Sequence, residues 1–136
     1  MAPNKDSSTP SSVVLGTGDA HYEEMFATLA GYHQDKMTAV LAYEADLAPL
    51  IYGGSDMFLM PSLFEPCGLG QLIAMRYGSV PVVRHTGGLA DTVREPRTGF
   101  VFHDFNASEL WHAIQREPSM CTTQTNRFGG TSRKMA

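Results

Sequence analysis

The sequence predicts an α/β fold in which a parallel β-sheet is doubly wound, with helices on both faces. Two patterns support this fold class. The short apolar segments are continuous rather than alternating with polar residues, which is typical of strands buried on both faces. Segments with helical spacing separate them, so each strand leads into a crossover helix. The 136 residues suffice for one such domain and are too few for two.

Three regions are expected along the chain. Residues 1–12 are rich in Ser, Thr and Pro and are predicted to be disordered. Residues 13–116 contain all the predicted strands and helices, and we expect them to form the domain. Residues 117–136 show neither a strand period nor a helix period, so they are predicted to be a disordered tail.

The first part of the domain contains two strand–helix units. Val13–Leu15 is a short apolar strand, and Asp19 in the turn GTGD can cap the helix that follows. Four apolar side chains share one face of that helix: Tyr22, Met25, Phe26 and Leu29. Lys36–Tyr43 is the second strand. Glu44–Gly54 is the second helix, with Pro49 in its first turn, where the missing N–H breaks no hydrogen bond.

A third strand and helix follow. The strand is Asp56–Met60, and a loop leads from it to the helix Gln71–Tyr77. Gly78 ends this helix, because glycine adopts the left-handed conformation of a C-terminal cap without strain. The fourth strand, Val80–Arg84, begins directly afterwards.

The end of the domain adds one more strand and one more helix. The segment HTGGLADTV is predicted to be a turn with a short helical piece. The last strand is Gly99–His103, and the last helix is Ser108–Gln115. Either Asn106 or Ser108 can supply the side-chain oxygen that caps this helix.

The composition excludes several classes of function. The net charge is −4, whereas non-specific nucleic-acid binding needs a basic face, so no nucleic-acid partner is expected. No apolar run approaches the roughly 20 residues that span a membrane, and the N-terminal sequence lacks the apolar segment of a secretory signal. Cys67 and Cys121 lack metal-ligand spacing, so we expect no metal site and a reducing, cytosolic compartment.

The loop Pro61–Gly70, between the third strand and its helix, is the candidate functional site. In an open parallel sheet, ligands bind beyond the carboxyl ends of the strands. The free N–H groups and the dipole of the following helix favour an anion such as phosphate, and Gly68 and Gly70 allow close backbone approach. Glu65 would repel an anion, so it is better suited to the hydroxyl groups of a sugar. The pattern predicts a nucleotide-sugar site, and the alternative of a strand–glycine–helix turn that binds nothing stays open.

The segment DMFLMPSLFEPCGLGQLIAMRYGSVPVVRHTGGLADTV resembles the C-terminal domain of bacterial glycogen synthases and plant starch synthases. The segments LGTGD, YEADLA, FEPCGL, AMRYG and TGGLADTV are similar to that family, and the resemblance covers roughly residues 13–114. The family consists of retaining glucosyltransferases with two Rossmann-like domains that face a cleft, the GT-B architecture. The resemblance implies that residues 13–116 are an incomplete, partial Rossmann-like domain from the C-terminal half of such an enzyme.

The resemblance also implies a reaction and its residues. Glucose would move from ADP-glucose to the non-reducing end of an α-1,4-glucan with retention of configuration, without a further cofactor. Glu65 matches the catalytic glutamate beside the donor glucose, and Tyr43 matches the aromatic residue on which the adenine ring stacks. The nucleotide-sugar-binding loop would consist of Cys67, Gly68, Leu69 and Gly70. Gly70 departs from the family, which usually has Thr or Asn at this position.

The sequence lacks parts that this family uses. The N-terminal domain with its KTGGL donor loop is absent, and so is the Arg/Lys pair that neutralises the diphosphate. We therefore expect the donor-binding C-terminal part of a glucosyltransferase, inactive alone, whose glucan acceptor would bind through the missing domain. Its location would be cytosolic, or plastidial in a plant. Two alternatives stay open: a non-catalytic nucleotide-sugar-binding module and an inert truncated product.

Individual residues have structural alternatives as well. Tyr43 would also suit a core aromatic position at a strand end, and Cys67 would suit a small buried filler. Arg84 could pair with Asp91 across a loop. Trp111 is expected to be a packing residue of the last helix rather than a sugar platform.

Overall fold

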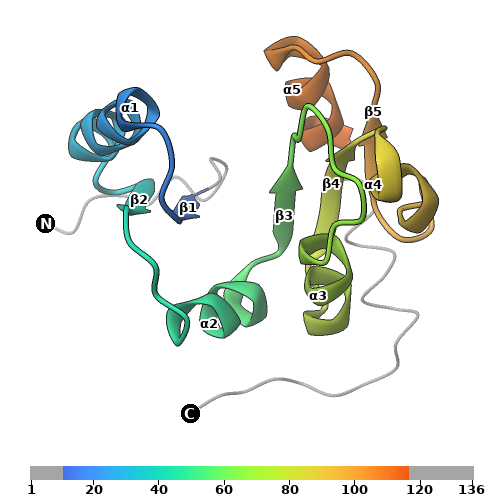
Figure 1. Cartoon of the computed structure of the whole chain (residues 1–136), viewed down its shortest axis with the longest axis horizontal. Coiled ribbons are helices and arrows are strands. Elements are labelled where there is room, and N and C mark those ends of the chain that lie inside the picture. The colour runs from blue at the N-terminus through green and yellow to red at the C-terminus, as the bar shows by residue number, and fades with distance from the viewer. Residues whose placement is uncertain (1–10, 117–136) are drawn as a thin grey trace, which may run out of the picture. The chain divides into compact units, whose positions relative to one another are not determined.

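The computed structural model describes residues 11–116, which form two compact units, residues 11–51 and residues 52–116 (Figure 1). The predicted tail, residues 117–136, lies outside the described residues, and so does most of the predicted disordered segment at the N-terminus. The first strand begins at Ser12 rather than at Val13. Cys121 also lies outside the described part of the chain.

The unit of residues 11–51 is built on a pair of parallel strands. Its elements are β1 (Ser12–Leu15), α1 (Ala20–Tyr32) and β2 (Met37–Val40). The predicted cap of α1 is confirmed, because the Asp19 carboxylate accepts a hydrogen bond of 2.9 Å from the backbone N–H of His21. β2 ends at Val40 rather than at Tyr43, since β1 offers only 4 residues for pairing.

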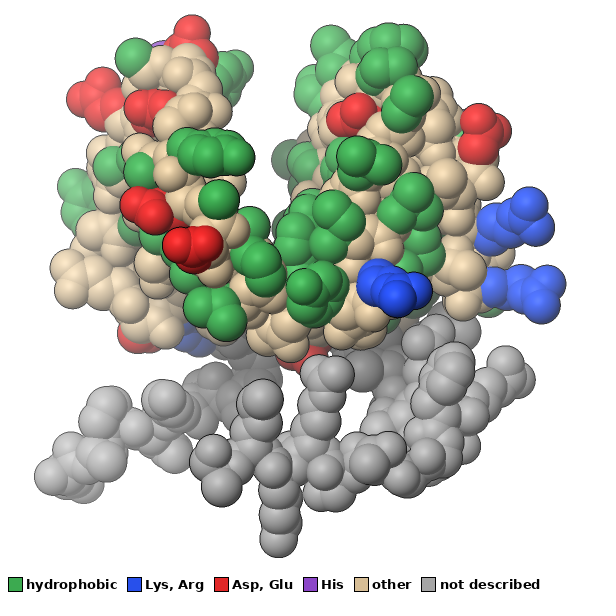
Figure 2. Space-filling view, turned by 60° about the horizontal axis from the view of Figure 1, so that its bottom comes forward, with side chains coloured by type: hydrophobic (Ala, Val, Ile, Leu, Met, Phe, Trp, Pro, Cys, Tyr) green, Lys and Arg blue, Asp and Glu red, His purple; other side chains and the backbone are tan. Residues whose placement is uncertain are grey.

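The core of this first unit is thin. Among the described residues, every fully buried apolar side chain belongs to residues 52–116. Helix α1 packs on β2, but its predicted apolar face stays largely open, with Tyr22 59% and Leu29 38% exposed. Apolar side chains therefore remain at the surface, where Figure 2 shows them in green.

The unit of residues 52–116 contains a three-stranded sheet. Helix α2 (Leu47–Gly54) leads into it, and its further elements are β3 (Met57–Met60), α3 (Gly70–Tyr77), β4 (Val80–Arg84), α4 (Gly87–Thr92), β5 (Phe100–Phe102) and α5 (Ala107–Arg116). The strand order is β3-β4-β5 (Figure 1). Both strand pairs are parallel, which confirms the predicted α/β class with parallel strands.

The strands form two sheets, however, where the sequence analysis expected one. In a doubly wound sheet the chain runs outward from a central strand, first to one side and then to the other. The connections β1→β2 and β3→β4→β5 each run from one strand to its neighbour within a single unit. Within residues 11–116 no strand pairs with the remaining edge of β1 or of β3. The two runs therefore stay separate sheets.

Helices cover both faces of the sheet β3–β4–β5. Successive residues of β4 point to opposite faces, as the two-residue period of a strand requires. Under α5 a buried cluster is formed by Val82, Phe100, Phe102 and Ala113. Under α4 a second buried cluster is formed by Val83, Leu89 and Val93. Helix α3 packs on β3 and β4, so the loop before α3 is attached to a well-packed element.

The residues that cap the helices agree with the prediction, whereas one helix begins later than predicted. Gly78 ends α3 in the left-handed conformation, with a φ of 85°. Asn106, not Ser108, caps α5, because its side-chain oxygen accepts a hydrogen bond of 2.8 Å from the backbone N–H of Glu109. Helix α2 begins at Leu47, later than the sequence predicted.

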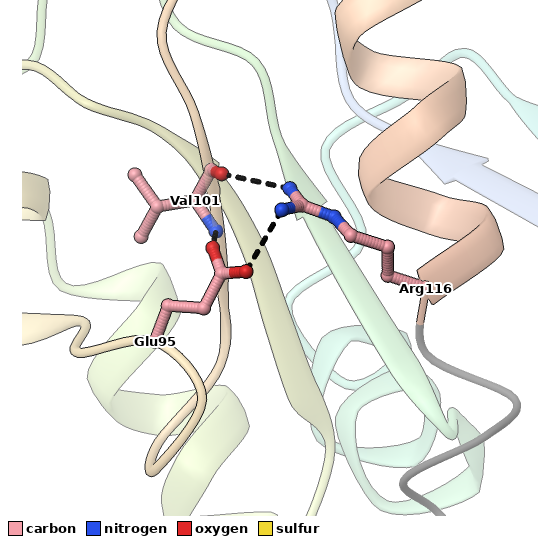
Figure 3. Close-up of polar contacts among 3 residues, drawn as sticks. All are labelled: Glu95, Val101 and Arg116. Carbon is pink, nitrogen blue, oxygen red and sulfur yellow. Dashed lines mark hydrogen bonds and ion pairs between the residues drawn. The ribbon is translucent and has the colours of Figure 1, made fainter.

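A hydrogen-bonded cluster joins the end of α5 to β5 (Figure 3). One carboxylate oxygen of Glu95 lies 2.8 Å from a guanidinium nitrogen of Arg116, and the other accepts a bond of 2.9 Å from the N–H of Val101. Arg116 also donates to the carbonyl oxygen of Val101 at 3.0 Å. This cluster ties α5, β5 and the loop before β5 together.

Candidate functional site

The loop Pro61–Leu69 connects β3 to α3 at the carboxyl edge of the parallel sheet (Figure 1). The segments that follow β4 and β5 begin at the same edge, because all three strands run in the same direction. Ligands of open α/β sheets bind at this edge. The structure therefore places the predicted loop where a ligand site is expected for this class of fold.

The start of α3 leaves several backbone N–H groups without an acceptor. Leu69 occupies the N-cap position and provides no capping side chain. Within the described part of the chain, the backbone N–H groups of residues 67–72 donate no hydrogen bond to a protein atom. These free donors and the helix dipole create partial positive charge at this point of the loop. The loop thus offers the groups that an anion needs.

Glu65 lies half-buried in the same loop. Its backbone carbonyl oxygen accepts a hydrogen bond of 3.0 Å from the N–H of Gly88. Its carboxylate, by contrast, has no hydrogen bond or ion pair with any of residues 11–116. Because its backbone is held in place and its carboxylate has no partner among these residues, Glu65 is suited to accepting hydrogen bonds from the hydroxyl groups of a ligand.

Gly68 has a conformation that other residues rarely adopt. Its φ is 69°, in the left-handed region that favours glycine. A Cβ atom added there would lie 2.7 Å from Oε1 of Gln71 and 3.1 Å from Cγ of Glu65. Gly68 therefore allows the loop to turn sharply beside the glutamate and to enter α3.

The remaining loop residues differ in their surroundings. Cys67 is exposed, so its alternative as a buried filler is wrong, and Leu69 is 69% exposed. Gly70 packs tightly, since a Cβ atom there would lie 3.0 Å from ring carbons of Phe58 and 3.4 Å from the hydroxyl of Tyr52. Burial raises the pKa of that tyrosine hydroxyl. The ring of Phe58 thus occupies space into which a larger residue at position 70 would point.

Tyr43 is 88% exposed. Its alternative as a core aromatic residue is therefore wrong. Tyr43 belongs to the unit of residues 11–51, whereas the loop belongs to residues 52–116, so its stacking on a nucleobase stays a prediction. Trp111 is 52% exposed, which leaves half of its side chain outside the packing of α5.

Arg84, at the end of β4, supports the loop rather than pairing with Asp91. One of its guanidinium nitrogens donates a hydrogen bond to the carbonyl oxygen of Leu63. The guanidinium carbon lies 5.5 Å from the ring centroid of Phe105, a cation–π contact. Neither interaction involves Asp91, so that predicted pairing is wrong.

Sequence reasoning missed the groups that hold the loop from the other side. It read the glycines of TGG only as part of a turn. In the structure, the N–H of Gly88 donates to the carbonyl oxygens of Glu65 at 3.0 Å and of Pro66 at 3.2 Å. Cβ atoms added to Gly87 and Gly88 would lie 2.0 Å from the carbonyl oxygen of Glu65 and 2.2 Å from that of Cys67. The paired glycines after a strand were the available signal for this close approach.

Gln71 is the second group that sequence reasoning missed. Its side chain is fully buried, with 0% exposure. Its Nε2 donates to the carbonyl oxygen of Gly68 at 2.9 Å and to Oγ1 of Thr92 at 3.1 Å. A polar residue in the first turn of a predicted helix was the only sequence signal, and it identifies no partner.

Two classes of site find no support among the described residues. Residues 11–116 contain no group of three or more His, Cys, Asp or Glu side chains placed to hold a metal ion. No helix in that part of the chain combines the length and apolar character needed to cross a membrane.

Comparison with known proteins shows the family. Residues 5–117 match the family described as Glycosyl transferases group 1. A glycogen synthase of Desulfitobacterium hafniense is 52% identical over 122 residues, which cover 85% of this chain and 26% of that protein. A glycogen synthase of Clostridium acetobutylicum is 57% identical over 109 residues, which cover 76% of this chain and 23% of that protein. The chain spans about a quarter of the length of the curated relatives that it matches.

Parts of two solved structures share the fold of this chain. The catalytic domain of starch synthase IV from Arabidopsis thaliana, bound to ADP and acarbose, matches with a TM-score of 0.72 and 32% identity, over 91% of this chain and 26% of that one. Sucrose-phosphate synthase from Thermosynechococcus elongatus matches with a TM-score of 0.65 and 25% identity. This match covers 79% of this chain and 29% of that one.

Proposed function

Because this chain belongs to the group 1 glycosyl transferases, we propose that its loop Pro61–Gly70 binds the donor of a glycogen- or starch-synthase-type glucosyltransferase. The donor would be ADP-glucose, and the acceptor an α-1,4-glucan. The observation that supports this most directly is the uncapped start of α3, with its free N–H groups. It lies in the same loop as the uncommitted carboxylate of Glu65, so one short segment offers both anion and hydroxyl recognition.

The proposed chemistry assigns a task to each part of the loop. The backbone N–H groups of residues 67–72 would bind oxygens of the distal phosphate. In the reaction, the bond between the glucose C1 and the phosphate oxygen breaks, and ADP leaves with the bonding electrons. A bond forms between C1 and the acceptor hydroxyl oxygen, whose proton passes to an oxygen of the departing phosphate or to solvent. Donors aimed at the departing phosphate stabilise the charge that develops there.

Glu65 would act on the sugar rather than on the phosphate. Its carboxylate has the free lone pairs to accept hydrogen bonds from glucose hydroxyl groups, and it would repel a phosphate that came into contact with it. Tyr43 would stack on the adenine ring. Its 88% exposure is compatible with that role, since its ring face is available to a ligand.

In this proposal, the role of this chain in the reaction is to bind the donor. The chain spans about a quarter of its relatives' length, and the Arg/Lys pair expected at the diphosphate is absent from its sequence. We therefore expect residues 11–116 to bind ADP weakly and not to transfer glucose alone. Non-catalytic binding of the nucleotide sugar is the second candidate function, because the free N–H groups and the carboxylate of Glu65 would support binding without transfer.

Calorimetric titration with ADP tests the proposal through Leu69, which is exposed and occupies the N-cap of α3. In Leu69→Asp, the new carboxylate should place a negative charge beside the free N–H groups and repel a diphosphate. The Kd for ADP should then rise about tenfold or more. The matched control Leu69→Ala, without the charge, should retain ADP binding. Unchanged affinity in Leu69→Asp would overturn the assignment of the anion to this helix start.

A further inference from the structure

We infer that Gln71 is a positioning residue for the donor site, acting together with Thr92. Its role is to fix the backbone that presents Glu65 and the free N–H groups. This inference rests on the proposed function of the loop and extends it to two side chains, those of Gln71 and Thr92, that make no contact with the donor. The residues belong to α3, α4 and the loop, all within residues 52–116.

The first part of this arrangement is the side-chain amide of Gln71. Nε2 has two hydrogens, and the two shortest contacts use both: the carbonyl oxygen of Gly68 at 2.9 Å and Oγ1 of Thr92 at 3.1 Å. The hydroxyl of Thr92 donates to the carbonyl oxygen of Gly88 at 2.7 Å, which leaves its lone pairs free to accept from Gln71. One side chain thus connects the turn of the loop to α4.

The second part is the close approach of α4 to the same loop. The N–H of Gly88 donates to the carbonyl oxygen of Glu65 at 3.0 Å. The loop backbone is therefore held at Glu65 by α4 and at Gly68 by the amide of Gln71. Because Thr92 bonds to the carbonyl oxygen of Gly88, these two attachments form one connected network.

The buried oxygen of Gln71 indicates what this position requires. Oε1 is buried and has no hydrogen-bond partner among the described atoms. An apolar side chain of similar size would avoid the desolvation of that oxygen. The three carbonyl or hydroxyl oxygens around Nε2, including that of Cys67 at 3.4 Å, demand a donor, so the reversed amide orientation is excluded. The hydrogen bonds of the loop therefore depend on the donating nitrogen of Gln71, Nε2.

The test compares variants of the full chain labelled with ¹⁵N. Gln71→Met keeps the size and removes both donors; Thr92→Val removes the hydroxyl, and Thr92→Ser retains it. We expect Gln71→Met and Thr92→Val to accelerate hydrogen exchange at the Gly88 amide and to weaken ADP binding about tenfold. Thr92→Ser should behave like the original chain. Ala74→Gly is the matched control: it removes a fully buried methyl group from the same helix, so it should lower Tm without changing the Kd for ADP.

The outcomes separate the two proposals. If the unmodified chain binds no ADP, the proposed function fails, whereas the positioning role is still decided by the Gly88 amide. Unchanged exchange at Gly88 in both Gln71→Met and Thr92→Val would overturn that role. A loss of ADP affinity in Ala74→Gly as large as in Gln71→Met would also overturn it, because affinity would then follow general stability. Should Gln71→Met fail to fold, the comparison of Thr92→Val with Thr92→Ser decides alone.

Discussion

Gly68 shows how one residue determines the shape of the site. Its left-handed backbone lets the chain turn directly before α3, and the missing side chain leaves room for Gln71 and Glu65. The sequence predicted that Gly68 allows a ligand to approach the backbone closely, and this stays a prediction, whereas the structure shows Gln71 and Glu65 beside it. The sequence could not reveal that the approaching groups belong to this same chain, because their packing depends on the folded loop.

Substitution of Gly68 tests this explanation. Gly68→Ala should lower the free energy of unfolding by about 2–4 kcal/mol, because it combines left-handed strain with a contact of 2.7 Å to Gln71. Gly78→Ala is the matched control: its φ is also positive, but no atom lies within 4 Å of an added Cβ. It should cost about 1–2 kcal/mol. Equal losses in urea denaturation would show that the contact contributes nothing.

At the scale of elements, most strands and helices were predictable because their signals are local. Asp19 and Gly78 mark a helix start and a helix end by chemistry that needs no tertiary contact. The start of α2 was predicted too early, although Pro49 held the information. A helix from Glu44 would require an N–H at Pro49 to bond to the carbonyl of Ala45, whereas a start at Leu47 places proline in the first turn.

The contacts that assemble the site were not predictable from local signals. Gln71 and Thr92 are 21 positions apart, as are Glu95 and Arg116. Neither pair shares a helix face or a strand, so no periodicity connects its members. Only the packing of α3, α4 and α5 around the sheet brings such residues together.

The pair Glu95–Arg116 gives a prediction at this scale (Figure 3). The two side chains are 31% and 47% exposed, so solvent weakens their attraction. A double-mutant cycle with Glu95→Gln and Arg116→Met, measured by urea denaturation, should give a coupling energy of about 0.5–1 kcal/mol. The coupling should shrink in about 1 M NaCl because salt screens exposed charges. A coupling that persists unchanged at high salt would contradict an electrostatic origin.

At the scale of the whole molecule, the two units differ in how well they are packed. The fully buried apolar residues among those described all belong to residues 52–116. Elements with few buried apolar contacts open at lower free energy. Amide hydrogens of β1, α1 and β2 should therefore exchange with solvent faster than those of β4. Equal protection in both units, measured by NMR or mass spectrometry, would contradict the inferred thin core of residues 11–51.

The overall class could be predicted because continuous apolar strands alternate with helices throughout residues 12–116. The division into two sheets could not, since the sequence of strands does not say which edges pair. Its physical basis is simple: β1 and β3 each pair with only one described neighbour. The candidate loop was predictable at the level of strand, loop and helix, whereas its support by Gln71 and the glycines of TGG was not.

The most direct test of the central claim is to map ADP binding on the ¹⁵N-labelled chain by NMR. At about millimolar ADP, the backbone amides of residues 67–72 should shift together and saturate with one Kd, because their free N–H groups would bind the phosphate. ADP-glucose should in addition perturb the resonances of Glu65. If ADP leaves the amides of residues 67–72 unchanged at that concentration, the start of α3 is not the donor site.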